Sequence, residues 1–216
     1  MIYPAIQNSN KCQWFDFSAS KVVFGGYESN YAERLLGDLH VNNCKGNALY
    51  INVIKENTRR TEYIEEAYRF SDEKFIISSE KCNDGLQMTV TVSGKKSLYR
   101  AVNRIVQMCR SSLFFEGELA DYPLFAKRGY IEGFYGNPWT HENRKMMLEM
   151  MSFYGMNTYY YAPKDDPYHR DKWDLLYPQN ELDQLSEIAA LCHEKFVDFH
   201  YCIAPGLSMK YSSEED

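Results

Sequence analysis

Two segments of the sequence, about thirty residues apart, each resemble a short strand that runs into a polar loop rich in glycine and aromatic residues. The first is Lys127–Thr140, with the sequence KRGYIEGFYGNPWT, and the second is Asn157–Arg170, with the sequence NTYYYAPKDDPYHR. Strands follow one another at about this spacing in a (β/α) barrel, whose chemistry lies at the carboxyl ends of the strands. The two segments therefore predict parallel strand–helix units with their polar loops gathered at one end.

The residues around these segments extend the same alternation of strands and helices. Strands are predicted at Gly129–Phe134, Asn157–Tyr161 and Phe196–Ile203. Thr140 is predicted to cap a helix that runs through Met146, Met147 and Met150 and ends near Gly155, and Asn180 to cap a helix whose Leu182, Leu185, Ile188, Ala189 and Cys192 face the sheet. Such alternation is typical of parallel βαβ units.

The first half of the chain has a different pattern, typical of an α+β domain. Helices are predicted at Ser29–Leu39 and Lys96–Cys109, and strands at Ala48–Val53, Ala67–Phe70, Lys74–Ser78 and Leu86–Val92, with a turn at Asn83–Gly85. This order predicts two helices that cover one face of an antiparallel sheet. Pro123 interrupts helix and sheet hydrogen bonding, so we place the boundary there, between an α+β domain at 1–122 and a barrel segment at 126–216.

Composition excludes several classes of function. A hydrophobic content of 44% and an aromatic content of 15% indicate a folded protein. The net charge of −6 argues against a nucleic-acid partner. The sequence has no polybasic run and no long apolar run, so nothing in it suggests binding to a membrane surface or crossing a membrane. The six cysteines form no C-x-x-C pair, which favours free thiols and no metal site. The start at Met1 has no pattern of a secretory signal, which favours a cytoplasmic location unless the N-terminus was processed.

Both motifs resemble those of the family 84 glycoside hydrolases, the β-N-acetylglucosaminidases that include protein O-GlcNAc hydrolases and clostridial hyaluronidase-like enzymes. The resemblance implies that residues 1–122 form the small α+β domain that precedes the barrel in hexosaminidases. It implies that residues 126–216 supply the first three β/α units of a TIM (β/α)8 barrel, which is incomplete in this chain. The implied reaction releases terminal N-acetylglucosamine from glycoconjugates with retention, through an oxazoline formed by the substrate's own acetamide, without cofactor or metal.

Three residues are candidates for contact with the sugar. A glycine at a strand end, such as Gly133, lets a ligand approach the backbone, although a bend or bulge would also explain it. Lys164 follows a strand, and its ammonium can donate to sugar hydroxyls or pair with Asp165 or Asp166. The resemblance implies that the Gly133 carbonyl and the Lys164 side chain each bind a hydroxyl of N-acetylglucosamine. Tyr135 is expected to line the sugar or aglycone side of the cleft.

No residue of the chain is predicted to be catalytic. Adjacent carboxylates beside a lysine, as at Asp165 and Asp166, favour a structural network within the loop, and Glu132 is expected to be an inward-facing structural carboxylate. The family's catalytic Asp-Asp pair lies on a later strand, so this chain is expected to be inactive alone and to need the remainder of its barrel as a partner. A non-catalytic sugar-binding or interaction remnant is the alternative function, and another hydrolase on this layout, such as an α-glucuronidase, is a third.

Overall fold

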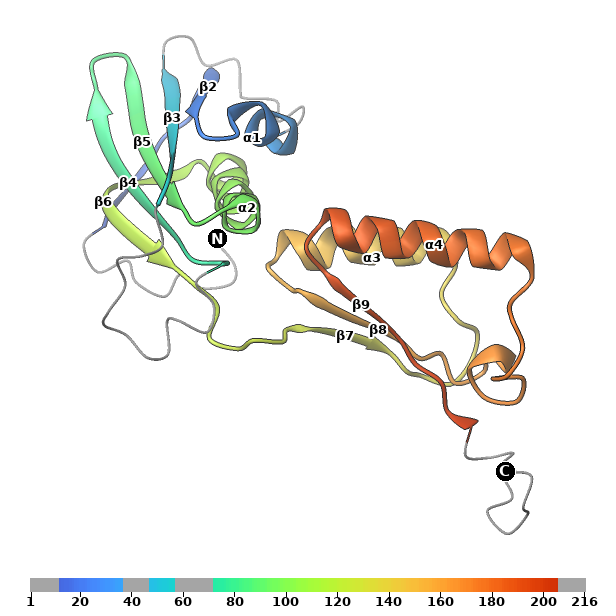
Figure 1. Cartoon of the computed structure of the whole chain (residues 1–216). Coiled ribbons are helices and arrows are strands. Elements are labelled where there is room, and N and C mark those ends of the chain that lie inside the picture. Colours follow the sequence, from blue (N-terminus) through green and yellow to red (C-terminus); the bar gives the residue numbers. More distant parts are fainter. Residues whose placement is uncertain (1–11, 37–46, 57–71, 206–216) are drawn as a thin grey trace. The chain divides into compact units, whose positions relative to one another are not determined.

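The computed structural model describes residues 12–36, 47–56 and 72–205, and the chain divides into two compact units at Ala126 and Lys127. Within these residues, the first unit is a six-stranded sheet with two helices, and the second is a three-stranded sheet with two α-helices and one short 3-10 helix (Figure 1). None of the helices within these described residues is both long and apolar enough to cross a membrane.

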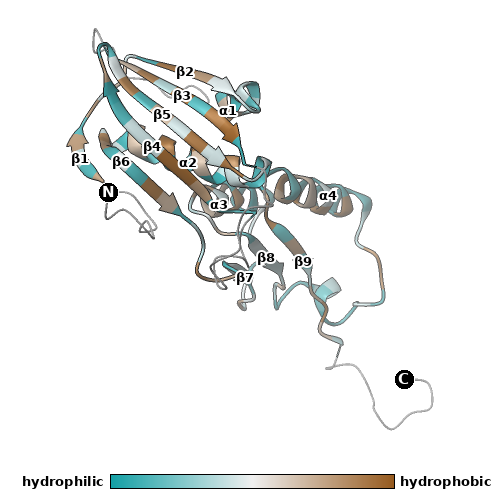
Figure 2. Ribbon diagram, turned by 60° about the vertical axis from the view of Figure 1, so that its left-hand side comes forward, coloured by the Kyte–Doolittle hydropathy of each residue, from teal (hydrophilic) through white to brown (hydrophobic). Residues whose placement is uncertain are grey.

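The first unit is an α/β arrangement around one mixed sheet. Its elements are β1 (Gln13–Asp16), β2 (Lys21–Gly26), α1 (Ser29–Leu36), β3 (Ala48–Lys55), β4 (Phe75–Cys82), β5 (Gly85–Val92), α2 (Lys95–Ser111) and β6 (Leu113–Asp121). The strands lie in the order β1-β6-β4-β5-β3-β2. The predicted alternation in β3 and β5 is confirmed, because Leu49, Ile51 and Val53 pair in register with Leu86, Met88 and Val90, and all six are buried. Figure 2 shows the resulting alternation of hydrophobic and hydrophilic residues along these strands.

The prediction of an antiparallel sheet is wrong, since β3 runs parallel to both β2 and β5. Period-two alternation identifies the buried face of a strand but carries no information on strand direction. The turn at Asn83–Gly85 does form a hairpin, between β4 and β5. The strand predicted at Ala67–Phe70 lies outside the described residues, as does the end of the first predicted helix beyond Leu36.

Strands β1, β2 and β6 were not predicted from the sequence. β1 and β2 are the edges of the sheet, and each buries little: Phe24 is the buried side chain of β2, and none of the four β1 side chains is fully buried. β6 starts directly after α2, and the reversal is made by Ser112 with a left-handed φ of 52°. The sequence pattern gave no signal for so abrupt a change from helix to strand.

The second unit confirms the predicted parallel strand–helix alternation. Its elements are β7 (Gly129–Glu132), α3 (His141–Phe153), β8 (Thr158–Tyr161), the 3-10 helix η3 (Pro167–His169), α4 (Gln179–Glu194) and β9 (Asp198–Tyr201). The strands lie in the order β7-β8-β9 and both pairings are parallel. The carboxyl ends of β7 and β8 consequently meet at one edge of the sheet, and the two polar loops start there.

The core of this unit lies between the sheet and the two helices. Tyr159 and Tyr161 of β8 pack with Leu148 and Met151 of α3 and with Ile188 and Cys192 of α4, which places both helices on one face of the sheet. On the other face, Ile131 of β7 is 60% exposed, beside Tyr160 and His200 in the register of the strands.

The predicted ends of these elements are only partly right. Thr140 caps α3 as predicted, because its hydroxyl accepts the N–H of Asn143, and Gly155 follows the helix with φ 81°. Asn180 is not the cap of α4: Pro178 holds that position without a side-chain hydrogen bond, and Asn180 lies in the first turn. β7 and β9 are shorter than predicted, and the left-handed φ of 56° at Phe196 keeps that residue out of β9.

Candidate functional site

The loops after β7 and β8 are joined directly where the two strands end. The N–H of Ala162 donates to the carbonyl of Glu132 at 3.2 Å, and the N–H of Lys164 donates to the carbonyl of Phe134, also at 3.2 Å. The parallel pairing of the strands therefore continues for two further steps into the loops. As a result, Gly133 and Lys164, two of the residues predicted to bind the sugar, lie on neighbouring segments.

The structure gives no internal reason for a glycine at position 133. Its φ is not in the left-handed region, so another residue could adopt the same backbone conformation. A Cβ placed there would meet only the Cγ2 of Ile131 at 3.0 Å and the carbonyl of Ala162 at 4.0 Å. Ile131 is largely exposed and its methyl group can move aside. The bend or bulge that would have explained Gly133 without a ligand is therefore absent.

The side chains of Lys164 and Tyr135 are available to contact a ligand. Among the described residues, the Lys164 ammonium has no hydrogen bond and no ion pair, and the pairing with Asp165 or Asp166 that the sequence allowed is not formed. Tyr135 is 72% exposed, and the Arg170 guanidinium lies 6.0 Å from the centre of its ring. Both side chains are thus at the carboxyl edge of the sheet and uncommitted to packing.

Glu132, at the end of β7, is the centre of a buried polar network. Its carboxylate accepts from the Nε of Arg144 at 2.9 Å and from the Nη2 at 2.8 Å, a two-pronged ion pair. It also accepts from the hydroxyl of Tyr159 and, at 3.0 Å, from the N–H of Trp139 in the loop after β7. The Glu132 side chain is 0% exposed, so this network fixes the strand, the next helix and the loop between them from inside.

Burial and hydrogen bonding shift the pKa of two groups in this network, Arg144 and Tyr159. Burial opposes the charge of Arg144, but its hydrogen bonds to Glu132 and the nearby acidic groups together outweigh that effect and raise the pKa of the guanidinium. Burial raises the pKa of Tyr159, and the hydrogen bond to Glu132 raises it further. Arg144 therefore stays charged, and Tyr159 stays a neutral donor, at physiological pH.

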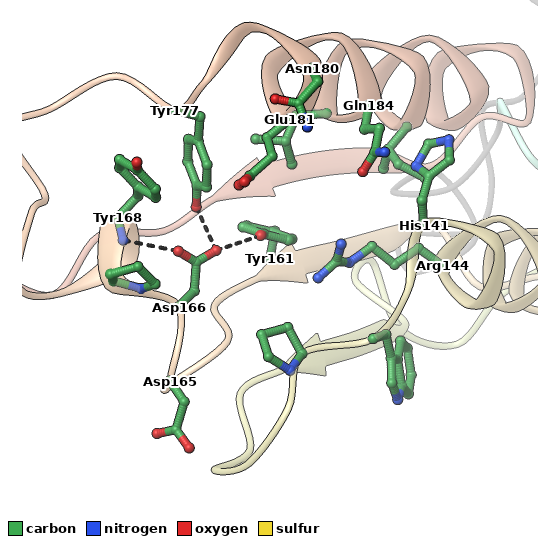
Figure 3. A pocket seen from close by; sticks show the side chains of 15 residues that line it. His141, Arg144, Tyr161, Asp165, Asp166, Tyr168, Tyr177, Asn180, Glu181 and Gln184 are labelled. Carbon is green, nitrogen blue, oxygen red and sulfur yellow. Dashed lines mark hydrogen bonds between the residues drawn. The ribbon is translucent and has the colours of Figure 1, made fainter.

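Asp166 is the centre of a second network, in the loop after β8 (Figure 3). One carboxylate oxygen accepts from the hydroxyls of Tyr161 and Tyr177, both at 2.7 Å, and the other accepts from the N–H of Tyr168 at 2.9 Å. The Asp166 side chain is buried and all of these partners belong to the loop or its flanking elements. It caps η3 and closes the loop, which agrees with the predicted structural role.

A pocket of about 460 Å³ opens between the first turns of α3 and α4, beside the Asp166 network. In Figure 3 the guanidinium of Arg144 points into it from α3, opposite Asn180, Glu181 and Gln184 of α4. Its other walls are Pro138, Trp139, His141, Tyr161, Asp165, Asp166, Pro167, Tyr168, Tyr177, Leu185 and Ile188. Gly133, Tyr135 and Lys164 do not line this pocket, so the predicted sugar contacts and the pocket are separate features of the same edge.

Arg144 and Tyr159 were not singled out from the sequence, although a signal for Arg144 exists. Arg144 precedes Leu148 by four residues and Met151 by seven, so it lies on the buried face of α3. A charge on an apolar helix face requires a buried partner of opposite charge, and Glu132 on the preceding strand is the nearest carboxylate in the sequence with an inward position.

The buried tyrosines predict a loss of stability in alkali. Burial raises the pKa of Tyr159, Tyr161 and Tyr177, and hydrogen bonds to Glu132 or Asp166 add to the effect. Their stabilising contribution is complete below the unfolded pKa of about 10 and is lost as the pH rises above it, by about 1.4 kcal/mol per pH unit for each phenol. We expect absorbance at 295 nm and circular dichroism to change together, in one transition above pH 10. Tyr177→Phe should make the stability fall less steeply, whereas phenol ionisation of all three before unfolding would contradict this.

Metal ligation has no support in the described parts of the chain, where no group of three or more His, Cys, Asp and Glu side chains could hold an ion. The five cysteines described there are free thiols, as predicted. Burial raises the pKa of the Cys192 thiol to about 12, which makes it a packing residue rather than a nucleophile.

Comparison with known proteins bears on both units. The family model described as beta-N-acetylglucosaminidase matches residues 128–216. Protein O-GlcNAcase of Rattus norvegicus is 40% identical over 88 residues, which is 41% of this chain and 10% of that protein. The chain therefore spans about a tenth of the length of this curated relative.

Two solved structures match over the whole chain. The structure of CpGH84B has a TM-score of 0.71 and 28% sequence identity, and the match covers 100% of this chain and 39% of that one. The structure of CpGH84D has a TM-score of 0.67 at 21% identity, with the same coverage, and supports the likeness of fold.

These matches show that the chain is similar to the beta-N-acetylglucosaminidase family model over residues 128–216 and to the structure of CpGH84B over its whole length. The predicted resemblance to the N-terminal portion of a family 84 glycoside hydrolase is confirmed.

Proposed function

We propose that this chain provides the N-terminal portion of a retaining β-N-acetylglucosaminidase, which removes terminal N-acetylglucosamine from glycoconjugates. The family match over residues 128–216 supports the class of reaction. In this proposal residues 1–122 are the α+β domain that precedes the barrel, and residues 126–216 are the first three β/α units of the catalytic (β/α)8 barrel.

The observation that carries the proposal is the unexplained glycine at position 133. Neither its backbone conformation nor its neighbours require a glycine, and it stands at the carboxyl end of β7, where barrel enzymes bind substrate. A side chain at this position would occupy the space over the strand end. Its absence lets a sugar approach closely enough for a hydroxyl to donate to the Gly133 carbonyl.

Lys164 and Tyr135 complete the proposed sugar contacts. The hydrogen bond from the N–H of Lys164 to the carbonyl of Phe134 holds Lys164 one strand away from Gly133. Its ammonium, which has no partner among the described residues, would donate to a second sugar hydroxyl. Tyr135 is exposed on the same loop as Gly133 and would line the sugar or aglycone side of the cleft.

The proposed mechanism is substrate-assisted. The acetamide oxygen of the sugar attacks its own anomeric carbon, the glycosidic oxygen leaves with a proton, and water then opens the oxazoline with net retention. One aspartate of a pair polarises the acetamide and its neighbour acts as general acid and then base. Asp165–Asp166 is the only adjacent aspartate pair in the sequence, and both carboxylates already accept hydrogen bonds from loop residues. We therefore assign the catalytic pair to a later strand and expect this chain alone to be inactive.

The partner that this proposal requires is the remainder of the barrel. The three strands of the second unit are parallel, and helices cover only one of their faces among the described residues. Parallel sheets in proteins are covered on both faces, so an exposed Ile131 at the middle of β7 fits a face that further strands and their side chains would enclose.

Replacement of Lys164 tests the function. In a protein that joins this chain to the rest of the barrel, Lys164→Ala should lower kcat/KM for an aryl N-acetyl-β-glucosaminide by a factor of about 10 to 150. This corresponds to the roughly 1.5–3 kcal/mol that a hydrogen bond from a charged group contributes. The control is Lys172→Ala, which removes an exposed lysine of the same connection and should leave kcat/KM unchanged.

An unchanged kcat/KM in Lys164→Ala would show that this lysine does not bind the sugar. Turnover by the 216-residue chain alone, abolished by an oxazoline-mimicking inhibitor, would contradict the assignment of the catalytic pair to a later strand. Sugar binding without turnover in the completed protein would instead favour the alternative, a non-catalytic sugar-binding or interaction remnant.

A further inference from the structure

Asp165 forms a side-chain hydrogen bond between the two loops of the candidate site. Its Oδ2 accepts the backbone N–H of Gly136, 29 residues away, at 2.6 Å. Gly136 has a φ of 97°, a left-handed conformation that favours glycine, and it follows Tyr135 directly. The bond therefore connects the residue after Lys164 to the residue after Tyr135.

This contact is the outermost of three ties between the loops. Nearer the sheet, the N–H of Lys164 donates to the carbonyl of Phe134 at 3.2 Å. Arg170 adds a weaker one, since its Nη1 donates to the Lys164 carbonyl at 3.4 Å while its guanidinium lies 6.0 Å from the Tyr135 ring. Of these, the bond from Gly136 to Asp165 is the shortest and has a charged acceptor, which makes it the strongest of the set.

The bond between Gly136 and Asp165 also bears on the charge of the neighbouring residue, Lys164. A lysine next to an aspartate in the sequence can pair with it and so lose its capacity to bind a ligand. Here the Asp165 carboxylate accepts from Gly136, and the Lys164 ammonium makes no ion pair with any described residue. Asp165 thus binds the loop after β7, while the ammonium of Lys164 remains available to donate hydrogen bonds to a ligand.

We propose that Asp165 is a positioning residue for the sugar site, because it holds the loop of Gly133 and Tyr135 at a fixed distance from Lys164. As a positioning residue, Asp165 neither touches the sugar nor exchanges a proton with it. Its effect is on preorganisation: with the bond present, the loop that carries the Gly133 carbonyl and the loop that carries Lys164 are held together before the sugar binds. This inference rests on the proposed function, since it assigns Asp165 a role in that same site.

The first experiment measures the loop itself, on the 216-residue chain. Hydrogen exchange of the Gly136 amide, followed by NMR, should be faster by about tenfold or more in Asp165→Ala than in the parent chain. Asp165→Asn keeps an acceptor oxygen and should show a smaller increase. Asp174→Ala, which removes an exposed carboxylate of the same connection, should show none. Asp165 is itself exposed, so these variants should keep the circular dichroism spectrum of the parent. Unchanged exchange in Asp165→Ala would overturn the proposal whatever the function.

The second experiment measures the site, on the chain joined to the rest of its barrel. Asp165→Ala should raise the KM for the aryl glycoside by about tenfold, with a smaller change in kcat, and Asp165→Asn should recover most of it. The pH dependence of kcat/KM should keep its shape, because Asp165 donates no proton. Faster exchange with an unchanged KM would make the bond purely structural and sink the proposal, as would a lost acidic limb in the pH profile. A parent protein that binds no N-acetylglucosamine would refute the proposed function, while the exchange result would still stand.

Discussion

Replacement of Glu132 by alanine is expected to destabilise the C-terminal unit by about 3–5 kcal/mol, which is the usual result of breaking a buried ion pair by removing one partner. The physical reason is the state in which the other groups are left. The Arg144 side chain, 10% exposed, would lose both of its hydrogen bonds to a carboxylate, and the Tyr159 hydroxyl would lose its acceptor. Chemical denaturation followed by circular dichroism measures the loss.

Two controls separate this effect from a loss of charge in general. Glu149→Ala, on the solvent side of α3, breaks an ion pair with Lys195 at 2.9 Å in which the glutamate is 59% exposed. Exposed pairs contribute about 0–1 kcal/mol, so this variant should be nearly as stable as the parent. In the double variant Glu132→Leu, Arg144→Met no charge is left buried, and stability should recover above that of Glu132→Ala. A loss of less than 1 kcal/mol in Glu132→Ala would show that the network is not what holds β7 to α3.

Gly129→Ala is expected to be among the most disruptive small substitutions in this unit. A Cβ at Gly129 would lie 1.7 Å from the carbonyl oxygen of Thr158 and 2.6 Å from its carbonyl carbon, which belong to the neighbouring strand. Backbone atoms of a paired strand cannot move aside, so β7 and β8 must separate at their first pair, Gly129 and Thr158. The cost should be at or above the upper end of the roughly 1–3 kcal/mol typical of overpacking.

Gly133→Ala is the matched control, because the same methyl group is added four residues further along. At that position the nearest atom is a side-chain methyl of Ile131, and stability should change by less than about 1 kcal/mol. The two substitutions should therefore differ clearly in thermal unfolding of the C-terminal unit. Equal losses would mean that Gly133 has a structural role after all, and would weaken the argument that it makes room for a sugar.

The parallel unit could be predicted from the sequence more fully than the mixed sheet before it. In the parallel unit, strand and helix patterns alternate. A helix between two strands returns the chain to the same end of the sheet, so the next strand runs parallel to the one before it. In the first unit, β3 pairs with β5 rather than with β4, and β4 then pairs with β6. Such pairings depend on contacts between distant segments, and no local pattern of apolar residues specifies them.

The sequence predicted which residues of the candidate site lie near each other along the backbone, but not which side chains contact each other. Gly133 and Lys164 could be placed together because parallel strands bring their carboxyl ends to one edge. A structural network at Asp165 and Asp166 was predicted, but the tyrosines that bind Asp166 were not, and the pairing of Glu132 with Arg144 was not predicted at all. Glu132 and Arg144 meet because the chain turns back within 12 residues, and Asp166 collects donors from before and after it in the sequence. Pairings of this kind follow from the loop conformation, which residue types alone do not determine.

The Asp166 network also marks where this loop can vary. Its bonds to Tyr161 and Tyr177 fix the entry and the exit of the connection between β8 and α4, independently of the residues at its outer end. That outer end includes Leu175 and Leu176, whose side chains are 55% and 82% exposed. Changes of length or sequence there would leave the closed base intact, which makes residues 174–176 a natural place for evolutionary insertion and a practical one for attaching a spectroscopic label.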